Sequence, residues 1–197
     1  MSTPPFTAPL PPPVQPKEIS SPPRGEDWSY EFLWSGERVR AIKEGENVRL
    51  LARDGRSLGN RFSRVAAAVA KIRAEHAVID GEILQLEGYS SEAIAYLSGV
   101  SDEVVQSKVV LLAYDLLQVD GTDMREMPLL GRRVMLAAML QGAPIVLSPL
   151  RAGSSDEALR TAARLGLRGI VAKRAGSSYR PNALVAPWVK IMLPTAV

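Results

Sequence analysis

The placement of proline limits how this chain can fold. Nine of its 15 prolines lie within the first 23 residues, in runs such as Leu10-Pro11-Pro12-Pro13. Proline has no backbone N–H and a fixed φ, so such a stretch cannot form a helix or an interior strand. We therefore expect residues 1–26 to be a proline-rich disordered lead-in and residues 27–197 to form one domain. A proline-rich ligand for a partner domain is the alternative role of the lead-in.

Short apolar segments separated by turn-forming pairs follow the lead-in, which is typical of antiparallel strands. The predicted strands span residues 29–34, 38–43, 47–53, 78–86, 109–119, 169–173 and 188–192. Apolar residues that recur with a period of about 3.6 residues predict helices over residues 61–73, 129–140 and 156–165. This mixed order favours an α+β fold with antiparallel sheets over a doubly wound parallel sheet.

Composition excludes several kinds of site. The chain of 197 residues has no cysteine, which excludes disulfides, a thiolate nucleophile and a cysteine-based zinc site. It has one histidine, His76, which excludes a multi-histidine metal centre. The first residues lack the basic and apolar regions of a secretory signal, so we expect a cytoplasmic protein with no membrane partner.

The net charge of +3 conceals a segregated pattern. Residues 38–73 have ten Lys or Arg against three acids, residues 74–123 have one against ten, and residues 124–197 have eleven against three. Two basic zones flanking an acidic one favour a positive face for a polyanion. A solvated surface without a partner is the competing interpretation.

Six short segments occur in an order typical of one family. They are residues 28–38, 52–55, 80–83, 113–117, 168–174 and 188–190. Together they closely resemble the adenylation domain of ATP-dependent DNA ligases, especially the ligase module of bacterial non-homologous end-joining proteins. The resemblance covers about residues 22–193 and implies a nucleotidyltransferase fold, with two antiparallel sheets, flanking helices and ATP in the cleft between them. Because the last motif lies close to Val197, we expect no OB-fold domain.

The resemblance also implies that the catalytic positions have changed. In the family motif Glu-x-Lys-x-Asp-Gly, the lysine attacks the α-phosphate of ATP, and Leu33 stands at that position. Leucine has no lone pair and cannot be a nucleophile. Ser35 replaces the aspartate, Arg168 replaces a metal-binding glutamate, and Met192 replaces the second lysine of Trp-x-Lys-x-Lys. We therefore predict no catalytic residue, no metal site and poor magnesium binding.

Positions that contact adenosine in the family mostly persist. The resemblance implies ATP or AMP as a weakly bound cofactor, with binding residues Glu31, Arg38, Arg53, Glu82, Tyr114, Lys173 and Lys190. Surface charge for the arginines and core packing for Tyr114 are the competing roles.

Three functional interpretations remain open. The favoured one is a pseudoenzyme of DNA repair that binds nucleotide or DNA as an accessory. The second is an active ATP-dependent DNA ligase in which a partner chain or a relocated lysine acts, the candidates being Lys43, Lys173 and Lys190. The third is a decayed paralogue without a ligand.

The expected partners are DNA and a DNA-repair protein. The DNA would be a nicked or broken duplex, bound without regard to sequence because arginines would contact phosphates. Those arginines are Arg53, Arg56, Arg61 and Arg64.

Overall fold

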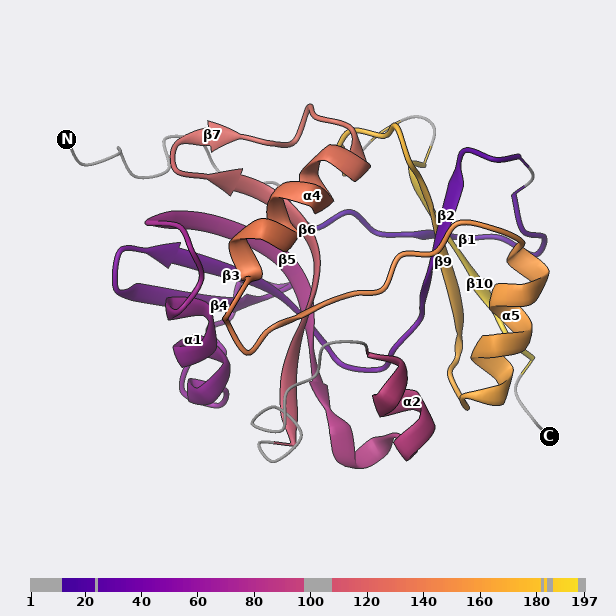
Figure 1. The fold of residues 1–197 in the computed structure, drawn as a ribbon, viewed down its shortest axis with the longest axis horizontal. Coiled ribbons are helices and arrows are strands. Elements are labelled where there is room, and N and C mark those ends of the chain that lie inside the picture. Colours follow the sequence, from indigo (N-terminus) through magenta and orange to yellow (C-terminus); the bar gives the residue numbers. More distant parts are fainter. Residues whose placement is uncertain (1–11, 24, 98–107, 182, 184–185, 195–197) are drawn as a thin grey trace.

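Two β-sheets and their flanking helices make up the fold of this chain (Figure 1). The computed structural model describes residues 12–23, 25–97, 108–181, 183 and 186–194. The larger sheet contains β3 (Glu37–Glu44), β4 (Asn47–Ala52), β5 (His76–Gln85), β6 (Val109–Val119), β7 (Thr122–Asp123) and β8 (Val146–Leu147). The smaller sheet has the order β1 (Lys17–Glu18), β10 (Trp188–Met192), β9 (Gly169–Arg174) and β2 (Trp28–Phe32).

Strand pairing in both sheets is mainly antiparallel, as the turn pattern predicts. The parallel pairs are β1 with β10 and β6 with β8. At the predicted Asp120-Gly121 turn between β6 and β7, both residues have positive φ, 42° and 82°. This backbone is typical of type I′ hairpin turns. The α+β prediction is therefore confirmed.

Helices cover the outer faces of the sheets. They are α1 (Ser63–Ala70), α2 (Ser91–Tyr96), α4 (Leu129–Leu140) and α5 (Ser155–Arg164), with a short 3₁₀ turn, η1 (Leu86–Gly88). One apolar cluster packs α1 and α4 against the larger sheet, and a second packs α2 and α5 around the smaller one. A third and smaller cluster joins the sheets and includes Val14, Ile42 and Trp188. The two sheets are thereby held at a fixed separation, with a pocket between them.

The lead-in differs from its prediction. For residues 12–23 the expectation of disorder is wrong, because Val14 is buried and β1 forms an edge strand beside β10. The physical reason is that an extended, proline-rich backbone suits a sheet edge wherever non-proline residues supply the N–H groups. Here the N–H of Ile19 donates to the carbonyl oxygen of Lys190 at 3.0 Å. The folded domain thus begins before Asp27, and residues 1–11 lie outside the described residues.

In the part of the chain that the structure describes, no helix is long and apolar enough to cross a membrane.

Candidate functional site

A pocket of about 190 Å³ lies where the two sheets meet, and we call it the inter-sheet pocket. Strands of both sheets supply its walls. Its lining residues are Gln15, Pro16, Glu31, Phe32, Leu33, Arg38, Glu82, Tyr114, Val171, Lys173, Trp188 and Lys190. The structure therefore brings together every residue proposed from the sequence to bind nucleotide except Arg53. Their role as nucleotide contacts remains a prediction.

Glu31 on β2 is the centre of one buried charge network. Its carboxylate oxygens lie 2.9 Å from Nη1 of Arg133 and 2.8 Å from Nζ of Lys173. All three side chains are buried, and burial lowers the pKa of Lys173, although the Glu31 carboxylate opposes that shift. Arg133 comes from the inner face of α4, so this helix fixes the position of Glu31.

Asp80 on β5 is the centre of a second network. Arg38 donates to both of its carboxylate oxygens, from Nε at 2.7 Å and from Nη2 at 2.6 Å. Burial alone would lower the pKa of Arg38, but the Asp80 carboxylate outweighs it and raises that pKa above its ordinary value. The hydroxyl of Tyr179 also donates to Asp80, at 2.8 Å, and accepts from the N–H of Val14 at 3.0 Å. The lead-in is thus hydrogen-bonded to the network that orients Arg38.

Glu82 fixes the loop that follows β2. It accepts hydrogen bonds from the hydroxyl of Tyr114 and from the N–H of Gly36. Burial, followed by the charge of Glu82, raises the pKa of Tyr114 well above its ordinary value. A Cβ at position 36 would lie 2.3 Å from the carbonyl oxygen of Ile83, so only glycine allows this close approach to β5. Leu33, the first residue of this loop, lines the pocket and packs against the third apolar cluster.

The lead-in forms one wall of the pocket, which sequence reasoning missed. Gln15 and Pro16 line it, and the carboxylate of Glu18 lies 3.0 Å from Nζ of Lys190. Lys190 therefore already has an anionic partner. The signal available in the sequence was the proline-free stretch of residues 17–21, which can pair as a strand.

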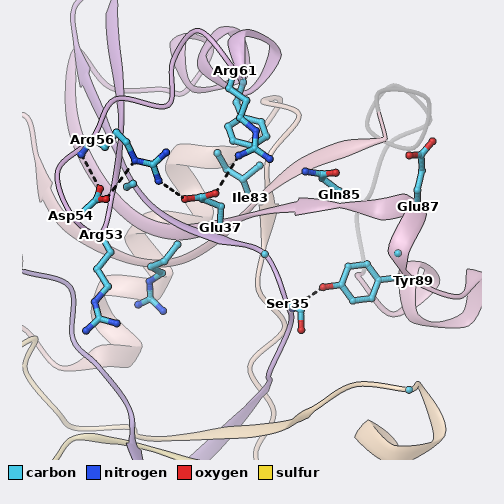
Figure 2. Close-up of a pocket in the computed structure, with 16 residues that line it drawn as sticks. Ser35, Glu37, Arg53, Asp54, Arg56, Arg61, Ile83, Gln85, Glu87 and Tyr89 are labelled. Atoms are coloured by element: carbon cyan, nitrogen blue, oxygen red, sulfur yellow. Dashed lines mark hydrogen bonds and ion pairs between the residues drawn. The ribbon is translucent and has the colours of Figure 1, made fainter.

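A second, open cleft of about 1090 Å³ lies beside the first pocket (Figure 2). Arg53, Arg56 and Arg61 line it, and Arg38 lines both the cleft and the inter-sheet pocket. Figure 2 shows Arg53 extending away from the ion pairs that Glu37 forms at 3.5 Å with Arg56 and Arg61.

Arg64 is the remaining arginine proposed to contact DNA. It is exposed on α1 and is not among the residues that line the open cleft.

The expectation of poor magnesium binding remains a prediction. Within the described ranges, no three His, Cys, Asp or Glu side chains come close enough to hold a metal ion. Arg168, where the family has a metal-binding glutamate, is exposed and acts electrostatically on Tyr89, outside the inter-sheet pocket.

The proposed replacement lysines occupy different environments. The ammonium of Lys43 donates to the carbonyl oxygens of Ala70 and Ile72, at 2.7 and 3.1 Å, at the end of α1. It is committed there and does not line the inter-sheet pocket, whereas Lys173 and Lys190 do.

Comparisons with known proteins agree with this arrangement of the two sheets. The profile of the family described as ATP dependent DNA ligase domain matches residues 14–191. The chain belongs to this family. Its sequence is 31% identical over 176 residues to the multifunctional non-homologous end joining protein LigD of Pseudomonas aeruginosa, covering 88% of this chain and 21% of that protein. The LigD of Mycobacterium bovis is 27% identical over 167 residues, covering 85% of this chain and 22% of the relative. The chain thus spans about a fifth of the length of these relatives.

Solved structures show the same fold. A mycobacterial DNA ligase D complexed with ATP and MES superposes with a TM-score of 0.72 and 26% identity, over 91% of this chain and 59% of that one. The ligase domain of Mycobacterium tuberculosis LigD has a TM-score of 0.71 and 24% identity, over 90% of this chain and 58% of that one. The predicted nucleotidyltransferase fold and the resemblance to end-joining ligase modules are confirmed.

Proposed function

We propose that this chain is a DNA-ligase adenylation domain that no longer forms lysine-AMP and acts in DNA repair as a nucleotide- or DNA-binding accessory. One observation carries the proposal: Leu33 lines the inter-sheet pocket where the family motif has its nucleophilic lysine. A leucine side chain cannot attack phosphorus whatever its surroundings. Arg168 and Met192 also replace family residues that act on metal and phosphate, which points in the same direction.

The ligand of the inter-sheet pocket is an adenosine nucleotide, AMP or ATP, bound weakly. Tyr114 and Trp188 line the pocket, and Trp188 has a buried indole N–H with no partner among the described residues. That donor suits an acceptor nitrogen of a purine. Weak binding follows because the pocket, at about 190 Å³, is smaller than most small-molecule sites, which measure roughly 300–1,000 Å³. Lys190 is also already paired with Glu18.

Calorimetric titration with AMP and with ATP tests this nucleotide role. Lys190→Ala should weaken ATP binding more than AMP binding because it removes a cation near the phosphates. Glu18→Gln should strengthen ATP binding by about two- to fivefold, the usual size of an exposed ion pair, because it frees Lys190. Lys108→Ala is the control, since Lys108 pairs with Glu87 and does not line the pocket. No heat of binding for either nucleotide would contradict the nucleotide role.

A working ligase with a relocated lysine is the second candidate, and one observation favours Lys173 for it. Lys173 lines the inter-sheet pocket, and burial lowers its pKa, which is one way a protein activates an amine. Its ion pair with Glu31, at 2.8 Å, opposes this role because it holds the ammonium in its charged form.

The open cleft is our candidate surface for DNA. Two of its arginines, Arg56 and Arg61, form long ion pairs with Glu37 and Asp54, at 3.4–3.5 Å, and such solvent-accessible pairs contribute little stability. A phosphate can replace these partners at small cost. Contacts of this kind bind duplex DNA without regard to sequence.

A further inference from the structure

A separate cleft of about 510 Å³ lies beside the chain segment between β9 and β10, and we call it the loop cleft. Its volume is within the range of small-molecule sites, roughly 300–1,000 Å³. It shares no lining residue with the inter-sheet pocket or the open cleft, so neither the nucleotide role nor the DNA role uses it. Its lining residues are Asp27, Arg174, Gly176, Ser177, Ser178, Arg180, Ala183 and Pro187.

Arg174, the last residue of β9, lines the loop cleft with a guanidinium that has no polar partner in the described part of the chain. Successive residues of a strand point to opposite faces, so Arg174 is exposed where the preceding Lys173 is buried. Its guanidinium lies 5.1 Å from the ring centroid of Trp28, the residue opposite it on β2. The ring supports the guanidinium, and the N–H donors of Arg174 are available to a ligand.

Buried residues hold the backbone that follows Arg174. The carbonyl oxygen of Ser177 accepts a hydrogen bond from Nη1 of the fully buried Arg132 at 2.9 Å. The hydroxyl of Ser177 donates to the carbonyl oxygen of Arg174 at 2.7 Å. The N–H of Tyr179 donates to the carbonyl oxygen of Arg125, also at 2.7 Å. This segment is therefore ordered before a ligand arrives, which lowers the entropic cost of binding.

Arg180 also lines the loop cleft, but its charge is already used. Its Nη2 lies 2.6 Å from a carboxylate oxygen of Glu126. A ligand would have to replace that carboxylate to reach Arg180, whereas Arg174 requires no such exchange. The cation that an anionic ligand meets in this cleft is therefore Arg174.

We propose that the loop cleft binds a free sugar phosphate, with the phosphate on Arg174 and a sugar hydroxyl on Asp27. A guanidinium binds two phosphate oxygens through parallel N–H groups, and the hydroxyl of Ser178 can donate to the same phosphate. Asp27 lines the cleft, and its carboxylate repels an anion that offers it no hydrogen-bond donor. Carboxylates accept hydrogen bonds from sugar hydroxyls, so Asp27 selects a phosphate that carries a sugar.

The acids of this region favour a free sugar phosphate over the end of a nucleic acid strand. A strand brings further phosphates, each with a negative charge. Asp27 lines the cleft and Glu126 lies beside Arg180, so the additional phosphates would meet carboxylates there. The proposal is independent of the nucleotide role and the DNA role of the other two sites.

Titration of the full chain with ribose 5-phosphate, followed by backbone ¹H–¹⁵N NMR at constant ionic strength, tests the proposal. The N–H signals of Gly176, Ser177 and Ser178 should shift and saturate with a dissociation constant on the order of 1 mM. Arg174→Ala should weaken this binding at least about tenfold, because two charge-assisted hydrogen bonds are lost. Arg49→Ala removes an exposed arginine outside the cleft and should leave the binding unchanged.

A conservative variant separates charge from geometry at the same position. Arg174→Lys keeps the charge but loses the planar pair of donors, so it should bind ribose 5-phosphate several-fold more weakly than the wild-type chain. Equal thermal unfolding of the Arg174 variants and the wild-type chain shows that they fold. Loop signals that stay unshifted at about 20 mM ribose 5-phosphate, or equal affinity in Arg174→Ala and wild type, overturn the proposal.

A comparison of ligands tests the contact with Asp27. Ribose 5-phosphate should bind at least about threefold more tightly than inorganic phosphate, and Asp27→Ala should remove this preference because it removes the acceptor of the sugar hydroxyl. A 5′-phosphorylated dinucleotide should bind more weakly than ribose 5-phosphate. Equal binding of phosphate and ribose 5-phosphate by the wild-type chain overturns the sugar contact, and tighter binding of the dinucleotide overturns the choice of a free sugar phosphate.

Discussion

The inter-sheet pocket and the open cleft share Arg38, but other ion pairs in the two regions differ in length and in exposure to solvent. Around Glu31 in the pocket, ion pairs of 2.8–2.9 Å join side chains that are at most 8% exposed. In the cleft, ion pairs of 3.4–3.5 Å join side chains that are 30–64% exposed. The buried charges around Glu31 are therefore committed to one another, whereas Arg56 and Arg61 of the cleft can exchange partners.

This contrast separates the side chains that maintain the fold from those that are available to a ligand. Removing a buried charge leaves its partner unpaired in a medium that solvates it poorly, so the cost falls on stability. Removing an exposed arginine changes the free energy of unfolding little and instead weakens attraction for an anion.

Loss of one partner of the buried Arg132–Asp115 ion pair should change the protein most, through its stability. Arg132→Ala leaves Asp115 fully buried without its partner and should destabilise the protein by about 3–5 kcal/mol. For a domain of this size, that loss corresponds to a fall in Tm of roughly 6–20 °C. Arg125→Ala breaks the exposed pair with Asp123 and should cost less than about 1 kcal/mol. Similar losses in the two variants, measured by thermal and urea unfolding, would contradict the contrast.

The next effect concerns restored chemistry in the pocket. Leu33→Lys alone should not revive adenylation, because Arg168 and Met192 leave the metal and phosphate contacts unmade. Leu33→Lys combined with Ser35→Asp, Arg168→Glu and Met192→Lys should be at least about 100-fold faster, since each such contact is worth about two to three orders of magnitude in rate. Single-turnover formation of the covalent adenylate measures both variants. Full activity of the single variant would refute the inference that the metal site is missing.

How far the sequence predicted this architecture depends on the range of the interactions. Strands such as β5 and helices such as α4 follow from local periodicity, and their bounds agree with prediction within a few residues. Strand β1 was missed because its pairing with β10 links residues about 170 positions apart, which no local pattern reveals. The short helix α2 and the strands β7 and β8 were missed because each offers too few residues for a period.

In the candidate site, too, contacts between residues far apart in the sequence were not predicted. The order of the motifs was enough to predict that Glu31, Glu82 and Tyr114 lie in one pocket, because the family fold fixes their positions. It did not reveal that Arg133 anchors Glu31, since an arginine within a helix usually faces water. It also did not separate Arg53 from the pocket, because only the pairing of β3 with β4 carries that residue to the open cleft.

Changes to the arginines of the open cleft should alter DNA binding modestly. Arg56→Ala combined with Arg61→Ala should reduce the slope of log affinity against log salt concentration by about 0.9 for each phosphate that the protein no longer neutralises. Arg49→Ala combined with Arg180→Ala removes the same charge from two exposed arginines that do not line the open cleft, and it should leave the slope unchanged. Fluorescence anisotropy with nicked and intact duplexes measures both. Equal slopes for the two double variants would exclude the cleft as the DNA surface.

We propose that this pocket no longer forms a covalent adenylate, and labelling with ATP detects that product. The purified chain is incubated with ATP labelled at the α-phosphate and with magnesium, denatured, and examined for covalently bound AMP, with an active ligase-family enzyme as the positive control. We predict no label on this chain, because Leu33 cannot form the phosphoramidate bond. Stoichiometric label would contradict the claim, and peptide mapping of that label to Lys173 or Lys190 would identify the lysine that replaces the missing nucleophile.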